Sequence, residues 1–338
     1  MEKKELETCF ATSCNFCEKD CPVYQVKKIK TLTARGRNRI LLGIFANKVN
    51  YSYELMENAY NCTLCGSCNA RCALDNTKRV IETRKKVVEL GYIKKECKEI
   101  VDNVINYGNI YKHKSPGLKE NDGIPLYLGC QYREAKPELE KIFHALHEFG
   151  INFFVPEEIC CGYIIYALGF RKEFEEYKKK FFDKYPYKEV ITLCPTCTYF
   201  LKNEYGIKVL HGIQILSKEG KGKKVLQRKV TYHDPCDLGR GLGLIEEPRS
   251  LLENVGLKLI EMEHNRYFSM CCGAGGGMLV SNPKIAKEIS LLRVKEAIDT
   301  NTNELITSCP TCELSLFRGV LSKKAKMKVR SIWEVLTS

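Results

Sequence analysis

The chain has 338 residues, of which 44% are hydrophobic and 19 are cysteines, and its formal net charge is +13. This length indicates two or three domains, and no apolar run reaches the roughly 18 residues that a membrane-spanning helix needs. The formal charge counts every cysteine as neutral, whereas cysteines that bind metal are thiolates. Much of the basic excess therefore balances bound metal and does not indicate a nucleic-acid partner.

The chain opens with Met-Glu-Lys-Lys-Glu and shows no apolar segment of a secretory signal. We therefore expect a cytoplasmic protein whose thiols stay reduced, and structural disulfides are disfavoured. Without a transmembrane segment of its own, such a protein would be peripheral to a membrane only through a partner subunit.

Residues 1–112 are predicted to form short helices around two cysteine runs. Apolar residues at helical spacing indicate helices over residues 33–45 and 76–90. Asn76 or Thr77 is placed to cap the second of these helices, and Gly91 is placed to end it.

The second cysteine run has the spacing C-x2-C-x2-C-x3-C of bacterial ferredoxins, in which three cysteines hold one cubane cluster and the fourth reaches the other. By that rule, one [4Fe–4S] cubane is expected on Cys62, Cys65, Cys68 and Cys21. The other is expected on Cys9, Cys14, Cys17 and Cys72. Four residues lie between Cys9 and Cys14 where the run has two, and Cys9 is assigned because it is the only candidate nearby. Zinc is the alternative for these eight thiols, but three close cysteines and a distant fourth, twice and reciprocally, fit a ferredoxin better.

The densest basic patch also lies in this region and comprises Lys27, Lys28, Lys30, Arg35, Arg37 and Arg39. Two interpretations stay open, a docking surface for an acidic redox partner and an ordinary solvated face.

Beyond residue 123 the pattern alternates between strand and helix, twice. The first half predicts strands over residues 124–128, 151–155 and 190–193, with helices over 137–149 and 172–184. The second half predicts strands over 230–232, 258–262 and 305–307, with helices over 247–254 and 283–297. Each half is a β-α-β-α-β unit, so we expect two Rossmann-like repeats. The predicted domains are residues 1–115, 116–225 and 226–338.

The same five-cysteine pattern occurs in both halves, which indicates an internal duplication. The first set is Cys130, Cys160, Cys161, Cys194 and Cys197, and the second is Cys236, Cys271, Cys272, Cys309 and Cys312. A vicinal pair rarely suits one tetrahedral ion, whereas two irons of one cluster could each take a sulfur. All ten cysteines follow predicted strands, where ligands of parallel sheets usually bind. The remaining cysteine, Cys97, is expected to be a buried or idle thiol.

Two further features lie in the second half. The glycine run 273–277 lacks the spacing of a dinucleotide-binding loop, and close backbone approach explains it better. Because the sequence has no such loop to bind a dinucleotide cofactor, electrons must come from a partner protein. His233 precedes Cys236 on the same strand end. Two roles stay open for His233. It could donate protons to thiolates that a reaction releases, or it could make a hydrogen bond that stabilises the end of the strand.

These motifs resemble the D subunit of heterodisulfide reductase, in which two ferredoxin-type cubanes precede two cysteine-rich CCG domains. The resemblance covers essentially the whole chain. It implies a noncubane [4Fe–4S] cluster on each five-cysteine set and a pocket between them where a CoB–CoM-type heterodisulfide is split in methanogenesis. It also implies that the cubanes receive electrons from a b-type cytochrome, a hydrogenase or a flavoprotein.

Electron counting agrees with this interpretation, because a disulfide takes two electrons while each cluster passes one. An alternative is a noncatalytic electron-transfer subunit, resembling the iron–sulfur subunits of glycolate, lactate or glycerol-3-phosphate dehydrogenase complexes, where a flavoprotein does the chemistry. The completeness of both five-cysteine sets favours the disulfide reductase. A purely structural role is weak, since it would not need eighteen thiols at cluster spacing.

Overall fold

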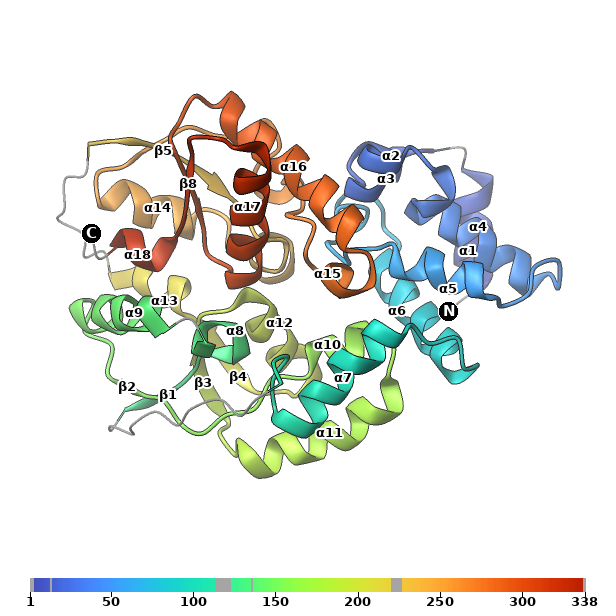
Figure 1. Ribbon diagram of the computed structural model, residues 1–338, viewed down its shortest axis with the longest axis horizontal. Coiled ribbons are helices and arrows are strands. Elements are labelled where there is room, and N and C mark those ends of the chain that lie inside the picture. Colours follow the sequence, from blue (N-terminus) through green and yellow to red (C-terminus); the bar gives the residue numbers. More distant parts are fainter. Residues whose placement is uncertain (1–2, 13, 113–122, 135, 220–226, 337–338) are drawn as a thin grey trace.

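The fold consists of a helical N-terminal region followed by two α/β units, each with its own parallel sheet (Figure 1). The computed structural model describes residues 3–12, 14–112, 123–134, 136–219 and 227–336. The predicted domain boundaries after residues 115 and 225 lie outside these ranges. The predicted fold class, a helical region followed by two repeated α/β units, is confirmed.

The N-terminal region is built from short helices joined by tight turns. Its elements are α1 Lys3–Ala11, α2 Phe16–Lys19, α3 Pro22–Lys27, η1 Lys30–Leu32, α4 Ala34–Phe45, α5 Tyr53–Tyr60, η2 Asn69–Arg71, α6 Asn76–Glu89 and α7 Lys95–Tyr107. Helices α4 and α6 confirm the two predicted helices. The predicted cap of α6 is wrong, because the Asp75 carboxylate accepts the Lys78 N–H at 3.0 Å. The Thr77 hydroxyl donates to the same carboxylate, which is the stronger acceptor.

The first α/β unit has four parallel strands in the order β2-β1-β3-β4. The strands are β1 Ile124–Tyr127, β2 Phe153–Phe154, β3 Glu189–Thr192 and β4 Lys208–His211. The helices are α8 Gly129–Glu134, α9 Lys136–Glu148, α10 Tyr163–Ala167, α11 Arg171–Lys184, α12 Pro195–Glu204 and α13 Gly212–Glu219. The three predicted strands are present, and β4 completes the sheet beyond them.

The second unit repeats this topology, with the strand order β6-β5-β7-β8 and all pairs parallel. The strands are β5 Lys229–His233, β6 Lys258–Leu259, β7 Glu304–Thr307 and β8 Lys328–Ser331. The helical segments are η3 Asp237–Gly241, α14 Glu247–Asn254, η4 Arg266–Phe268, α15 Met278–Ser281, α16 Pro283–Asp299, α17 Pro310–Lys323 and α18 Ile332–Leu336. Matching topology confirms that the sequence repeat is a structural repeat.

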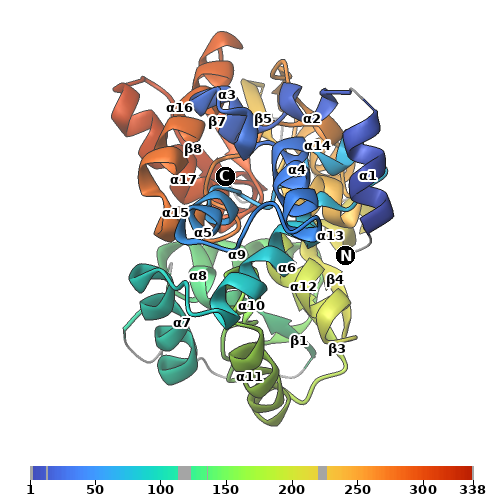
Figure 2. The same cartoon turned by 90° about the vertical axis from the view of Figure 1, so that its right-hand side faces the viewer.

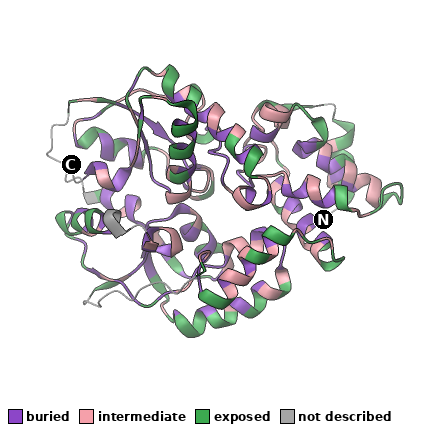
Figure 3. Cartoon of the chain, in the orientation of Figure 1, coloured by how far each residue is buried: buried purple, intermediate pink, exposed green. Residues whose placement is uncertain are grey.

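The two units lie against each other, and the N-terminal region contacts both of them (Figures 1 and 2). Each unit also sends its last helix to the other, since α13 contacts α14 and α18 contacts α9. Trp333 of α18 donates its indole N–H to the Tyr132 hydroxyl of the first unit at 3.2 Å. The buried residues follow the sheets and the inner helix faces (Figure 3), and Cys97 is among them, as predicted. None of the described helices combines the length and apolar character that a membrane crossing requires.

The buried Arg84 side chain of α6 connects all three parts of the chain. Its guanidinium donates to the Cys62 and Ala59 carbonyls of the N-terminal region at 2.7 and 3.0 Å. It also donates to the Ala167 carbonyl of the first unit at 2.6 Å and to the Gly276 carbonyl of the second at 2.7 Å. Because a guanidinium offers five donors in a rigid plane, one side chain can hold these backbone segments in register.

We predict that Arg84→Lys destabilises the fold by about 3 kcal/mol or more, because an ammonium cannot reach all four carbonyls and each lost charge-assisted bond costs roughly 1.5–3 kcal/mol. The measurement is the free energy of unfolding under anaerobic conditions. Arg318→Lys on the exposed face of α17 is the matched control. Equal stability of the two variants would contradict the role given to Arg84.

Candidate functional site

The ten cysteines of the repeated sets lie at the carboxyl ends of the two sheets. Cys130 follows β1 and Cys194 follows β3, the two strands between which the order of the first sheet reverses. Cys236 and Cys309 take the same positions after β5 and β7. This reversal leaves a crevice above the strand ends, which is the usual ligand position in parallel sheets.

The Cys-Pro-Thr-Cys motifs form the start of a helix in each unit. Cys194 is the N-cap of α12 and Pro195 its first residue, so Cys197 lies in the first turn, and Cys309 and Cys312 stand in the same way on α17. The free N–H groups and positive dipole end of a helix favour thiolates there. Hydrogen bonds from neighbouring thiols also favour the thiolate form of some cysteines in each set.

Three thiols of the two sets have pKa values below the usual range. The Cys160 and Cys197 thiols donate to Cys161 and lower its pKa to about 6, with 3.6 Å between the Cys161 and Cys197 sulfurs. Cys197 and Cys309 lower the pKa of Cys194. Cys271 and Cys312 lower the pKa of Cys272. Each set therefore offers anionic sulfur in a buried place, which demands a positive partner.

The two sets meet around one cavity of about 160 Å³ between the units. Nine of the ten cysteines line it, with only Cys271 set back, and the Cys194 and Cys309 thiols are hydrogen-bonded across the boundary between the units. The remaining walls are mostly apolar, with Leu64, Ile100, Ile110, Ile164, Leu279 and Val280 among them, and they also carry the polar side chains of Gln131, Thr196, Asp237 and Thr311.

The N-terminal cysteines are also shared between their two runs. Burial raises the pKa of Cys21 to about 11, and the nearby Cys62 and Cys65 act in the same direction. Burial raises the pKa of Cys17 to about 11 as well, and Cys9 and Cys72 are among the charges that it feels. The structure thus brings Cys21 to the second run and Cys72 to the first. Cys14 lies at the exposed edge of this region.

One run touches the second five-cysteine set directly. A hydrogen bond with the Cys271 thiol, followed by burial, raises the pKa of Cys65 well above its usual range. The glycine run explains this approach, since a Cβ at Gly275 or Gly276 would lie 2.8 Å from the Thr63 backbone. The role predicted for these glycines, close backbone approach, is confirmed.

Comparison with known families agrees with this geometry. A model of the CCG cysteine-rich domain matches residues 124–202 and 230–317, and a model of a 4Fe-4S dicluster domain matches residues 5–76. The chain is a CCG cysteine-rich domain protein. Its dicluster domain implies two cubane clusters, and the cysteine groups of its CCG domains are consistent with further clusters.

Relatives of this CCG protein include an iron–sulfur protein, a subunit of a reductase and an oxidoreductase. An uncharacterized iron–sulfur protein of Methanococcus maripaludis is 33% identical over 80% of this chain, which spans only 59% of that relative's length. The D subunit of the dihydromethanophenazine:CoB–CoM heterodisulfide reductase of Methanosarcina acetivorans is 29% identical over 97% of this chain and 92% of its own. The EtfAB:quinone oxidoreductase of Syntrophomonas wolfei is 30% identical over 83% of this chain and 46% of its own.

The predicted basic patch of this CCG protein is not one continuous surface. Arg35 and Arg37 are buried and donate to backbone carbonyls, including that of Cys14 at 2.5 Å and that of Asn61 at 2.5 Å. Lys27 pairs with Glu288 of the second unit at 2.8 Å. Neither interpretation, docking surface or solvated face, holds for all six residues, because backbone carbonyls around the cysteine loops bind Arg35 and Arg37 in the interior.

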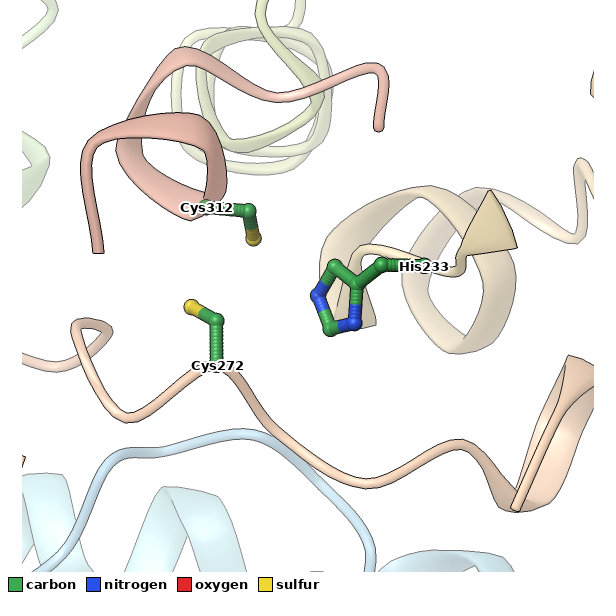
Figure 4. A group of neighbouring side chains, drawn as sticks. All are labelled: His233, Cys272 and Cys312. Atoms are coloured by element: carbon green, nitrogen blue, oxygen red, sulfur yellow. The ribbon is translucent and has the colours of Figure 1, made fainter. Parts of the chain in front are cut away.

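His233 is buried at the end of β5, and one edge of its ring faces the second set (Figure 4). Ligand atoms of His233, Cys272 and Cys312 lie within 4.8 Å of one another. The Arg293 Nε–H donates to His233 Nδ1 at 2.9 Å. Burial, followed by the Arg293 charge, lowers the pKa of His233 well below its usual range, so the ring is neutral at physiological pH.

Two crossed hydrogen bonds hold the cysteine sets of the CCG units together, and sequence reasoning missed both. The Thr196 hydroxyl of the first unit donates to the Asp237 carboxyl of the second at 2.5 Å. The Thr311 hydroxyl of the second unit donates to the Gln131 side-chain oxygen of the first at 2.6 Å. Each pair joins the threonine of one Cys-Pro-Thr-Cys motif to the residue after the leading cysteine of the other set. The repeated threonine was the available signal.

We predict that Thr196→Val lowers the free energy of unfolding by about 1–3 kcal/mol and Thr311→Val by about 0.5–1.5 kcal/mol, because the first bond is to a carboxyl group and the second to an amide. Anaerobic denaturant unfolding measures both. Thr196→Ser and Thr311→Ser keep the hydroxyl and should retain most of the stability. Serine variants as unstable as the valine variants would show that the crossed bonds are not the cause.

Proposed function

We propose that this iron–sulfur oxidoreductase subunit of the CCG family reduces a small-molecule disulfide of the CoB–CoM type in the cavity between its two α/β units. The observation that carries the proposal is that both cysteine sets open onto one cavity, with the Cys194 and Cys309 thiols in contact across the boundary. A chain that only relays electrons has no evident need for two matched sets facing a shared space.

The donor sets fit iron–sulfur clusters. Each has five thiols, including a vicinal pair, and some of these thiols favour the anionic form in a buried place. In the proposal, one noncubane [4Fe–4S] cluster is held by Cys130, Cys160, Cys161, Cys194 and Cys197. The other is held by Cys236, Cys271, Cys272, Cys309 and Cys312. The two cubanes are held by Cys62, Cys65, Cys68 and Cys21, and by Cys9, Cys14, Cys17 and Cys72.

When bound, such clusters supply one-electron transfer and an iron acceptor for sulfur. The residues of the chain supply the surroundings. Ile100, Ile110 and Leu279 give the cavity an aliphatic wall, which lowers the local dielectric and excludes water from the reacting sulfurs. The crossed threonine bonds fix how far apart the two cysteine sets stand. Splitting the disulfide consumes two electrons and two protons and releases two thiols.

The electrons would come from a partner protein, such as a b-type cytochrome, a hydrogenase or a flavoprotein. The contact between Cys65 and Cys271 supports a route for these electrons, because Cys65 is a proposed cubane ligand and Cys271 belongs to the second five-cysteine set. The similarity to the D subunit of a heterodisulfide reductase, over nearly the full length of both chains, supports the same interpretation.

A second candidate is an electron-transfer subunit that serves a flavin-dependent dehydrogenase, such as one for glycolate, lactate or glycerol 3-phosphate. The similarity to an EtfAB:quinone oxidoreductase favours it. The partner that copurifies from native cells separates the two candidates. A flavin-linked dehydrogenase supports the relay, whereas a b-type cytochrome or a hydrogenase supports disulfide reduction.

Protein purified without oxygen should contain about 16 irons per chain if all four clusters are present. Cys161→Ser should remove the signal of one noncubane site and leave the cubane spectra intact, because Cys161 belongs to the first five-cysteine set alone. Iron analysis and low-temperature electron paramagnetic resonance measure both. A count near 8 irons, or loss of the cubane signals in the variant, would refute the assignment.

With a reduced viologen as artificial donor, the protein should oxidise two viologen radicals per CoB–CoM heterodisulfide, since the reaction takes two electrons. Cys161→Ser should reduce this rate to background while its cubanes still accept electrons from viologen. Absorbance of the viologen radical follows the reaction. If the protein holds all four clusters and reduces no disulfide, disulfide reduction is refuted and the electron-relay function remains.

A further inference from the structure

The two cysteine sets differ at one position that the strand register makes equivalent. Tyr127 pairs with Thr192 in the first sheet, and His233 pairs with Thr307 in the second. Both threonines stand two residues before the first cysteine of a Cys-Pro-Thr-Cys motif, so Tyr127 and His233 are counterparts. The internal duplication has therefore placed an aromatic phenol beside one set and an imidazole beside the other.

The polar atoms of these counterparts are used differently. The Tyr127 hydroxyl donates to the Ile159 carbonyl at 2.7 Å, so its proton is committed to the backbone. His233 is 1% exposed, and its Nε2 is buried without a hydrogen-bond partner among the described residues. In Figure 4 this edge of the ring faces the Cys272 and Cys312 sulfurs. Of these two counterparts, only His233 directs a polar atom without a hydrogen-bond partner toward the cysteines of its set.

Arg293 determines what that nitrogen carries. A guanidinium never gives up its protons in proteins, so the Nε–H of Arg293 is always the donor in its 2.9 Å bond to His233 Nδ1. Nδ1 must accept, and a neutral imidazole that accepts at Nδ1 carries its hydrogen on Nε2. An N–H nitrogen has no lone pair for a metal, so His233 is a donor toward the sulfurs and not a further ligand.

We propose that, once the second set holds its metal, His233 donates its Nε2 N–H to the thiolate sulfurs of Cys272 and Cys312, and that this makes the second metal site easier to reduce than the first. Hydrogen bonds to ligand sulfurs stabilise the more negative, reduced state of an iron–sulfur centre and raise its potential. Arg293 is the positioning residue that fixes the tautomer. The inference rests on the proposed function in that the second set holds a cluster.

This role differs from the proton-donor role that the sequence indicated. Releasing the Nε2 proton while Arg293 occupies Nδ1 would leave an imidazolate, so the proton stays on the ring during turnover. Two sites with the same five ligands then differ in reduction potential. The second site, which lies beside Cys65, is reduced first.

The test is a potentiometric titration followed by electron paramagnetic resonance in the Cys161→Ser background, where the second set gives the remaining noncubane signal. His233→Leu should lower the ratio of reduced to oxidised second site at a fixed potential by roughly tenfold, which is 59 mV for a one-electron centre. His233→Phe, which keeps a ring in the register that Tyr127 occupies, should act in the same way. His233→Gln retains an N–H and should restore most of the shift.

The matched control is His211→Leu, which removes a buried histidine whose Nε2 is bonded to the Leu193 carbonyl at 2.9 Å; it should leave the second-site potential unchanged. An unchanged potential in His233→Leu or His233→Phe, with iron content retained, would overturn the inference and leave the proposed function standing. Absence of any noncubane signal from the wild-type protein would overturn both.

Discussion

The arrangement depends on one buried cation. Arg84 donates to carbonyls of the N-terminal region, the first unit and the second unit at the same time. Its position sets the distance between the Cys62 loop and the glycine run of the second unit, and hence the contact between Cys65 and Cys271. A guanidinium suits this place because its donors spread in a plane and its charge also offsets the thiolates nearby.

The duplicated units form a site only as a pair. Each sends a terminal helix to the other, and each Cys-Pro-Thr-Cys threonine is bonded to the opposite unit. The cavity therefore belongs to the boundary between the units and to neither sheet alone. Because the contacts are reciprocal, the two cysteine sets face the shared cavity in a nearly symmetric arrangement. Under the proposed function, each of the two sulfurs of a disulfide would face one cysteine set.

The symmetry is incomplete at positions beside the cysteine sets. Asp237 stands where the first unit has Gln131, and His233 where it has Tyr127. The two halves carry equal cysteine sets, whereas the residues beside them differ in charge and in the hydrogen bonds that they make. Under the proposed function, two centres that accept electrons in turn would gain from such a difference, since the order of reduction would then be defined.

The sequence by itself determined the cysteine sets, the repeat and most of the strands and helices, because spacing and periodicity are local properties. It also indicated close packing of the glycine run. Only the tertiary structure decided that Asp75 caps α6, that Arg35 and Arg37 turn inward, and that Thr196 and Thr311 bond across the boundary. The contacts of Cys65 with Cys271 and of Arg293 with His233 join residues that lie far apart in the chain. Such contacts arise from the packing of whole units, for which the local pattern of residues carries no signal.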